Sequence, residues 1–107
     1  MTPSIPFNDW LIKKHLKDPK NACAYLNAAL EEGDRHHFLI TLRNVAEAQG
    51  GLLALARRTR MNRGHLYRLL SHGGNPEITS LERLLEAMGF GFQISVLKSK
   101  HSRRHAA

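Results

Sequence analysis

Residues 51–70 read GLLALARRTRMNRGHLYRLL and contain two short helical patterns with a break between them. The first pattern, residues 52–58, places apolar side chains on one face of a helix of about two turns. The break falls at residues 59–61, and Asn62, a favoured N-cap residue, predicts a second helix that runs to Leu70. One face of this second helix is apolar, and the other is polar and basic. The apolar face consists of Leu66, Leu69 and Leu70, and the polar face of Arg63, Gly64, Tyr67 and Arg68.

Two short helices joined by a tight turn, in an otherwise helical chain, describe a helix-turn-helix. The packing requirements of that motif are met by three residues. Ala56 is small at the point where the two helices would cross, Met61 supplies a buried hydrophobe for the turn, and Leu66 anchors the second helix. The sequence therefore predicts a DNA-binding unit over residues 51–70.

The basic side chains of this unit are the candidate DNA contacts. Arg63 and Arg68 have the geometry to bind guanine or phosphate, and the sequence does not separate these two roles. Arg57 and Arg58 end the first helix, where such a helix crosses the phosphate backbone. His65 is either a DNA-facing donor or simply a solvent-exposed side chain.

The net charge of +7 belongs entirely to the second half of the chain. Residues 1–56 carry six basic and six acidic side chains, whereas residues 57–107 carry ten basic and three acidic ones. A concentrated, arginine-rich surface is expected of a protein that binds a polyanion. A basic face that only maintains solubility is the alternative, and charge alone does not decide between them.

Start and stop signals divide the first half into helices. Asp18, followed by a proline, predicts the start of a helix that Gly33 ends. Asp34 then predicts the start of the next helix, which ends at residues 50–51. Asn8 could cap a shorter amphipathic segment before both of them.

The C-terminal part predicts one more helix and one strand. Thr79 and Glu82 form a T-x-x-E capping box, which predicts a helix over residues 79–88. Residues 91–97 alternate apolar and polar side chains, which predicts a single β-strand. A lone strand would pair with a second copy or a partner protein, and the alternative is an extended tail that lies over the helices. Residues 98–107 are polar and basic, and we expect them to be disordered.

The predicted fold is therefore mainly α, with five or six short helices, a helix-turn-helix and one C-terminal β-strand. A length of 107 residues fits one small domain, which we expect over residues 1–97. Its N-terminal helices would lie in residues 8–50, before the helix-turn-helix at 51–70, the closing helix at 79–88 and the strand at 91–97.

The composition also indicates a compartment. No apolar run approaches the roughly 20 residues of a membrane-spanning helix, and the N-terminus lacks the basic and apolar regions of a secretory signal. The single cysteine, Cys23, cannot form an internal disulfide, and we expect it to be a small buried hydrophobe. We therefore expect a cytoplasmic protein.

Several longer motifs resemble a known family. They are residues 24–34 (AYLNAALEEGD), 51–59 with 61–63, 66–70, and the loop 74–77 (GNPE). Together they are similar to the helix-turn-helix antitoxins of the addiction module antidote protein group, which are HigA-like members of the Xre/λ-repressor-type superfamily. The resemblance covers roughly residues 18–97. It implies a cytoplasmic homodimer that binds palindromic double-stranded operator DNA, neutralises a RelE/ParE-type toxin encoded beside it in a type II toxin–antitoxin module, and represses their shared operon.

By position, the resemblance implies that Arg63, Gly64, Tyr67 and Arg68 face the bases and that Asn62 caps the helix and touches a phosphate. The main departure is Arg60, where the family usually has a glycine in the turn. A non-glycine residue at such a position, which favours positive φ, costs roughly 1 kcal/mol or more. The turn either accepts this strain or has a different shape. Gly64 either reflects drift or allows close approach to the DNA backbone.

Three other functions remain open. A stand-alone Xre-type repressor would share every helix-turn-helix feature without a toxin partner. A pure interaction module would use the helices of residues 8–50 and the strand to bind a partner. An RNA-binding protein would need exposed aromatic side chains, for which only Tyr67 and Phe92 are available. For the toxin contact, the N-terminal half and the strand are both candidates, and we prefer the N-terminal half because the other half faces DNA.

Enzyme and metal functions are disfavoured. His36 and His37 point about 100° apart on a helix, and His65 and His72 have no third ligand at a suitable spacing. The chain has no G-x-S-x-G motif and no glycine-rich phosphate loop. We therefore expect no catalytic activity, no metal and no cofactor.

Overall fold

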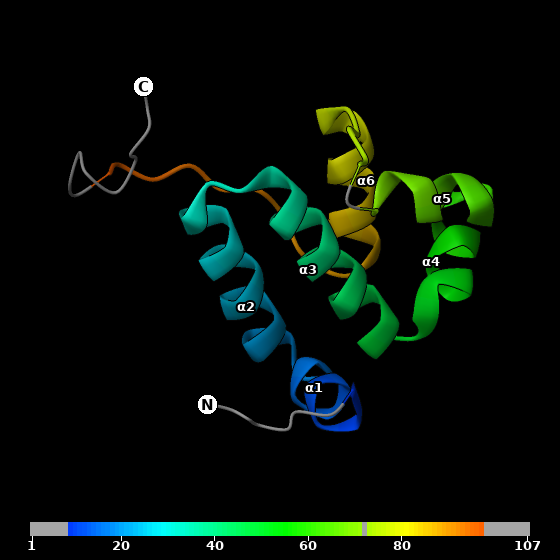
Figure 1. The fold of residues 1–107 in the computed structure, drawn as a ribbon, viewed down its shortest axis with the longest axis horizontal. Helices are drawn as coiled ribbons and strands as arrows, with labels where there is room; N and C mark the ends of the chain where they lie inside the picture. The colour runs from blue at the N-terminus through cyan, green and yellow to red at the C-terminus, as the bar shows by residue number, and fades with distance from the viewer. Residues whose placement is uncertain (1–8, 72, 98–107) are drawn as a thin grey trace.

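The computed structural model describes residues 9–71 and 73–97, and this part of the chain is mainly α-helical, as predicted. None of the helices in these ranges is long and apolar enough to cross a lipid bilayer. The described residues contain six helices (Figure 1): α1 (Asp9–Leu16), α2 (Pro19–Glu32), α3 (Arg35–Ala48), α4 (Gly51–Thr59), α5 (Arg63–Leu69) and α6 (Ile78–Ala87).

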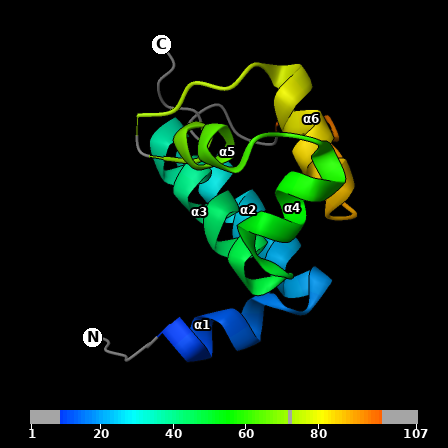
Figure 2. The same cartoon turned by 90° about the vertical axis from the view of Figure 1, so that its right-hand side faces the viewer.

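Helix α3 is the centre of the fold. It contacts α1, α2 and α4, and α4 in turn contacts α5 and α6. Figure 2 shows α4 and α5 in front of α3, with α2 behind it. Seven of the 14 residues of α3 are buried, because its apolar side chains recur on a face wide enough to meet several neighbours at once. This burial makes α3 the scaffold on which the other helices pack.

The predicted starts of α2 and α3 and the predicted end of α2 are confirmed, whereas α3 ends at Ala48, before the predicted residues 50–51. The Oδ1 atom of Asp18 accepts a hydrogen bond from the Lys20 backbone N–H at 2.9 Å, and Asp34 Oδ1 accepts one from the His37 N–H at 3.1 Å. These bonds satisfy donors that have no partner in the first turn of a helix. Gly33 ends α2 with a φ of +78°, the left-handed conformation that glycine adopts without a Cβ penalty.

Helix α1 is tied to the end of α3 and exposes its other face. Leu16 is buried in the core, and its carbonyl accepts a hydrogen bond from Gln49 Nε2 at 3.2 Å. Trp10 is 64% exposed, and the ammonium of Lys14 lies 5.1 Å from the centre of its ring. The predicted cap of this helix, Asn8, lies outside the described residues.

The predicted capping box at the start of α6 is wrong. The helix begins at Ile78, one residue before Thr79, and its N-cap is Glu77, which forms no side-chain capping bond. Thr79 therefore lies inside the first turn, where its hydroxyl cannot cap the helix. The pattern was correct in predicting a helix here but not the residue at which it starts.

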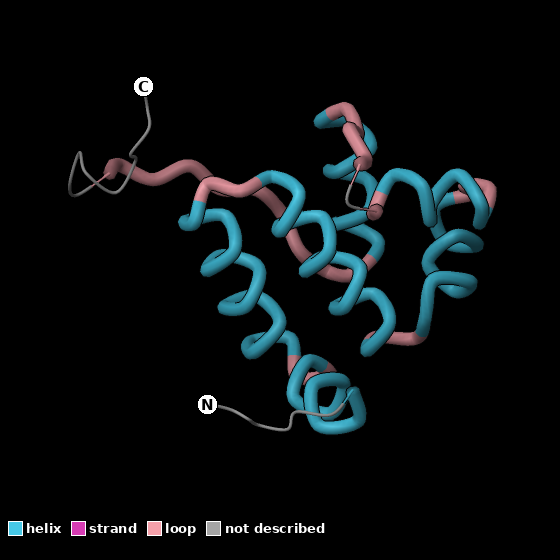
Figure 3. Tube along the Cα trace, in the orientation of Figure 1, coloured by secondary structure: helices cyan, strands magenta, loops and turns pink. Residues whose placement is uncertain are grey.

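The predicted C-terminal strand is also wrong for the described residues. Residues 91–97 are irregular and exposed (Figure 3), and none of their backbone groups bonds to another backbone group in the described chain. A strand needs a second strand beside it, and the described ranges offer none. The alternating apolar side chains consequently point into solvent, with Ile94 96% and Val96 91% exposed. The predicted disordered tail, residues 98–107, lies outside the described residues.

Candidate nucleic-acid interface

Helix α5 presents most of its surface to solvent. Asn62 is its N-cap, as predicted, and its Oδ1 accepts a hydrogen bond from the His65 backbone N–H at 3.1 Å. Leu66 is the one residue of α5 that is fully buried, and it anchors the helix to the core. The residues of the predicted polar face are all exposed, and so is His65: Arg63, Gly64, Tyr67 and Arg68.

The turn between α4 and α5 takes the strained conformation considered from the sequence. Arg60 has a φ of +61° and a ψ of +29° and is the one non-glycine residue with positive φ among the described residues. It ends α4 in the left-handed region, which costs an L-residue about 1–2 kcal/mol. The Met61 backbone N–H then bonds to the Ala56 carbonyl at 3.0 Å, which closes the end of the helix. Met61 itself is half-buried against the core.

The two arginines at the end of α4 have different surroundings. Arg57 is exposed, and its phosphate contact stays a prediction. Arg58 is exposed as well, but its Nη1 donates a hydrogen bond to the Ala87 carbonyl at 3.2 Å. This carbonyl is at the C-terminal end of α6, where the acceptors of the last turn have no partner within the helix. Arg58 therefore joins α4 to α6, a role that the sequence did not indicate.

Gly64 leaves room for two neighbouring side chains. A Cβ at this position would lie 3.2 Å from Asn62 Oδ1 and 3.8 Å from Arg68 Nη1. The first distance is shorter than normal van der Waals contact, so a side chain here would press on the cap. The second shows that the Arg68 side chain lies back along α5 over the glycine. The space that Gly64 leaves for its neighbours therefore explains a glycine here, in addition to drift or close approach to the DNA backbone.

Tyr67 of α5 contacts an arginine of another helix, α3. It is 39% exposed, and the Arg43 guanidinium carbon lies 4.9 Å from the centre of its ring. This distance is within the range of a cation–π contact. Arg43 belongs to α3, in the half of the chain with no net charge, and no spacing rule relates it to Tyr67. Sequence analysis therefore missed it, although it adjoins the candidate interface.

The loop after α5 requires a glycine at position 74. A Cβ on Gly74 would overlap the Leu69 carbonyl group and lie 2.9 Å from the Arg68 carbonyl oxygen. A Cβ on Gly73 would meet nothing within 4 Å. The first residue of the GNPE loop thus allows the chain to pass directly against the end of α5.

The arginines of α4, the turn and α5 form no salt bridge with any described residue. In the described chain the one salt bridge joins His37 Nε2 to Glu32 Oε1 at 3.5 Å, at the junction of α2 and α3. No described carboxylate therefore neutralises the arginines of α4, the turn and α5 by direct contact. The exposed arginines of this region are Arg57, Arg58, Arg60, Arg63 and Arg68.

Two further sequence predictions concern reactive side chains. Cys23 is exposed on α2, not buried as expected, because the apolar face of this helix is centred on Ala22 and Leu26. Its neighbour Asn27 places Nδ2 3.6 Å from the sulfur. The described residues contain no group of three or more His, Cys, Asp or Glu side chains that could hold a metal ion, and His72 lies outside them.

One carboxylate has a displaced pKa. The His37 backbone N–H donates to Asp34, and this bond lowers the pKa of the Asp34 carboxyl below its ordinary value of 3.8. Asp34 is exposed at the junction of α2 and α3, away from the arginine-bearing face. It belongs to the scaffold rather than to the candidate interface.

Comparison with known proteins identifies a family and a relative that match most of the chain. A family model described as "Probable addiction module antidote protein" matches residues 7–96. An uncharacterised protein of Haemophilus influenzae is 29% identical over 86 residues, which cover 80% of this chain and 88% of that protein. No solved structure matches the chain.

Proposed function

The chain belongs to the family of probable addiction module antidote proteins, and from this membership we propose that it is the antitoxin of a type II toxin–antitoxin module. In this proposal it binds and neutralises a RelE/ParE-type toxin encoded beside it and represses their shared operon. The observation that carries the proposal is the family match, which extends over residues 7–96 and so includes every described helix. The chain needs no catalytic activity and no cofactor for this role.

The proposed repression depends on α4 and α5 acting as a HigA-like, Xre-type helix-turn-helix. Helix α5 would enter the major groove, with Arg63 and Arg68 at the base edges and Arg57 at a phosphate. A homodimer would place two such helices in successive major grooves of a palindromic operator, about 34–36 Å apart. The exposed arginine-rich face of α5 and its cap at Asn62 support this assignment. Arg58, bound to the α6 end, would contribute its charge rather than a direct contact.

The proposed toxin contact uses an apolar surface that joins α2 to residues 92–97. Leu30 on α2 is 44% exposed, and cavities of about 260, 260 and 440 Å³ open beside it. Exposed apolar groups of this extent are typical of protein interaction sites. Figure 1 shows residues 92–97 on the opposite side of α3 from α5, so that a bound toxin would leave the DNA face free. The exposed apolar side chains are Leu30, Phe92, Ile94, Val96 and Leu97.

A growth assay tests the antitoxin role. The open reading frame adjacent to this gene is expressed with and without this chain, and we expect an arrest of growth that the chain relieves. Normal growth in both cultures would contradict the toxin partner and leave a transcriptional repressor that acts alone.

A variant pair tests the proposed toxin surface. Replacing Ile94 and Val96 together by aspartate should abolish the relief of arrest while DNA binding persists. Thr79→Asp, which adds charge at an exposed polar position of α6 outside these three cavities, is the control. If the double variant instead lost its dimeric state and kept its hold on the toxin, the surface would belong to a second copy of the chain.

A further inference from the structure

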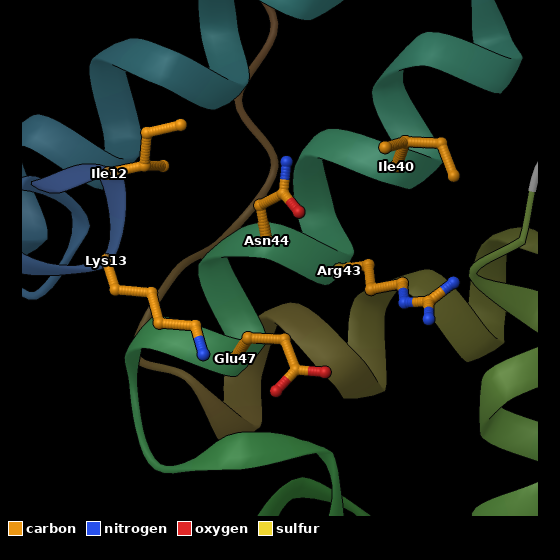
Figure 4. Close-up of a pocket in the computed structure, with 6 residues that line it drawn as sticks. All are labelled: Ile12, Lys13, Ile40, Arg43, Asn44 and Glu47. Atoms are coloured by element: carbon orange, nitrogen blue, oxygen red, sulfur yellow. The ribbon is translucent and has the colours of Figure 1, made fainter. Parts of the chain in front are cut away.

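A groove between α1 and α3 lies beside the interface described above (Figure 4). Its volume is about 340 Å³, and α1 contributes Ile12 and Lys13 to its lining. Figure 4 shows the Lys13 side chain on one side of the opening and the Arg43 side chain on the other, extended away from Lys13, with Asn44 and the Glu47 carboxylate between them. The groove therefore contains two cations, an amide and one carboxylate, all from the half of the chain that has no net charge.

Arg43 connects this groove to α5. Its guanidinium carbon lies 4.9 Å from the centre of the Tyr67 ring, and Arg43 also lines the groove. The groove is thus continuous with the exposed polar face that carries Arg63 and Arg68. A polyanion lying along α5 would reach the groove without leaving the surface of the protein.

The two cations are free to bind an anion. Neither Lys13 nor Arg43 forms a salt bridge with any described residue. Glu47 lines the same groove, but its carboxylate pairs with neither of them. The planar fork of an arginine suits the bidentate geometry of a phosphate, and a lysine adds a mobile point charge.

We infer that this groove is a phosphate-binding subsite for duplex DNA: the Arg43 guanidinium holds a backbone phosphate that flanks the base pairs read by α5, and Lys13 adds positive charge on the other side of the groove. The stacked ring of Tyr67 fixes the direction of the Arg43 fork. This inference rests on the proposed function, since it requires DNA on α5. It extends the DNA contact surface to α1 and α3, which the charge of the chain's two halves does not indicate.

The experiment measures affinity for the duplex upstream of the gene over a series of KCl concentrations, with the full chain. Arg43→Ala should weaken binding about threefold to tenfold and reduce the slope of log K against log salt by about one unit, because one phosphate is no longer neutralised. Lys13→Ala should act in the same direction with a smaller effect. Arg35→Ala is the matched control, because Arg35 is an exposed arginine at the other end of α3. It should bind as the wild type does.

Two further variants separate the charge from the geometry. Arg43→Lys keeps the charge but loses the planar fork, so the salt slope should stay near the wild-type value while affinity falls. Glu47→Gln removes a negative charge beside the phosphate and should raise affinity about twofold to threefold. Thermal unfolding of each variant identifies any loss of folding, and Arg43→Lys carries the test if Arg43→Ala does not fold.

The outcomes distinguish the inference from the function on which it rests. A wild-type chain that does not bind the upstream duplex contradicts the proposed repression. If the wild type binds and Arg43→Ala matches Arg35→Ala, the phosphate subsite alone is overturned. Weaker binding of Arg43→Ala with an unchanged salt slope would also overturn it, since Arg43 would then act only through Tyr67. Loss of toxin binding with intact DNA binding would assign the groove to the protein partner.

Discussion

Helices α3 and α5 differ in what holds them in place. Helix α3 has 14 residues and buries seven of them, whereas α5 has seven residues and fully buries only Leu66. The position of α3 therefore follows from apolar burial distributed over many side chains. The position of α5 depends on a few specific features around it, namely the Asn62 cap, the turn at Arg60 and the close approach of Gly74. A helix that must expose its surface to a partner cannot also rely on burial.

The largest change in stability is expected from a substitution in the loop after α5, which helps to hold this helix in place. Gly74→Ala should destabilise the protein by about 3 kcal/mol, because the new Cβ overlaps the Leu69 carbonyl and forces the backbone to move. Gly73→Ala, where a Cβ meets nothing within 4 Å, is the control and should change stability little. Chemical denaturation of both variants measures the difference. Equal stability of the two variants would mean that the end of α5 does not depend on this close approach.

The next effect concerns the exposed face itself. Arg68→Ala should weaken operator binding by roughly 1–3 kcal/mol, and random duplexes should lose less, if Arg68 reads a base. Arg83→Ala, an exposed arginine on α6, serves as the control for net charge. Competition binding with both duplexes gives the result. An equal loss on operator and random DNA would make Arg68 a phosphate contact only.

The cap of α5 is expected to contribute less than the loop. Asn62→Ala removes the acceptor for the His65 N–H and should cost about 1 kcal/mol of stability. Asn62→Asp keeps an acceptor and should stay close to wild type. Helical content and thermal unfolding report both variants. If Asn62→Ala proved neutral, packing rather than capping would fix the start of α5.

A substitution at Arg60, in the turn between α4 and α5, should increase stability. Arg60→Gly should stabilise the protein by about 0.5–1 kcal/mol, because glycine adopts a φ of +61° without strain. The relief of this strain exceeds the cost of the greater conformational freedom that glycine has in the unfolded chain. Arg60→Ala keeps the strain and should give no gain. Thermal unfolding of the two variants decides the matter. A gain in both would place the cost in the arginine side chain instead of the backbone.

The smallest expected effect is a difference in pH dependence between the caps of α3 and α5. The pKa of Asp34, which caps α3, is lower in the folded state than its ordinary value of 3.8, whereas Asn62 does not titrate. The stabilisation from Asp34 is therefore complete above pH values near the unfolded pKa and is lost as the pH falls through the folded pKa. Asp34→Asn should be less stable than wild type near neutral pH, and the gap should narrow in acid. A gap that is independent of pH would contradict the bond between Asp34 and His37 as its source.

Local sequence rules predicted the ends of the helices well. Asp18, Asp34 and Asn62 each cap the helix that they were expected to cap, because a cap depends on residues within one turn. The same locality explains the error at α6. A capping box signals a nearby helix start, but the helix begins one residue earlier, at Ile78, and its N-cap Glu77 forms no side-chain capping bond.

Contacts between distant residues could not be predicted. The bond from Arg58 to the Ala87 carbonyl spans 29 positions, and the stacking of Arg43 on Tyr67 joins α3 to α5. Both depend on how the helices pack, which no periodicity encodes. The alternation over residues 91–97 failed for a related reason, since a strand is a property of two segments and the pattern described only one.

The exposed indole of Trp10 on α1 provides an intrinsic fluorescent probe. Trp10 is the single tryptophan of the chain, so the tryptophan emission arises from one ring at the surface, beside the ammonium of Lys14. Emission near that of an indole in water is expected, and an anionic quencher such as iodide should act more strongly than a neutral one because the ammonium attracts it. Lys13 on the same helix lines the groove, and a polyanion held there would displace iodide. We therefore expect quenching of this single fluorophore to weaken when a polyanion occupies the groove, which can be followed without any label.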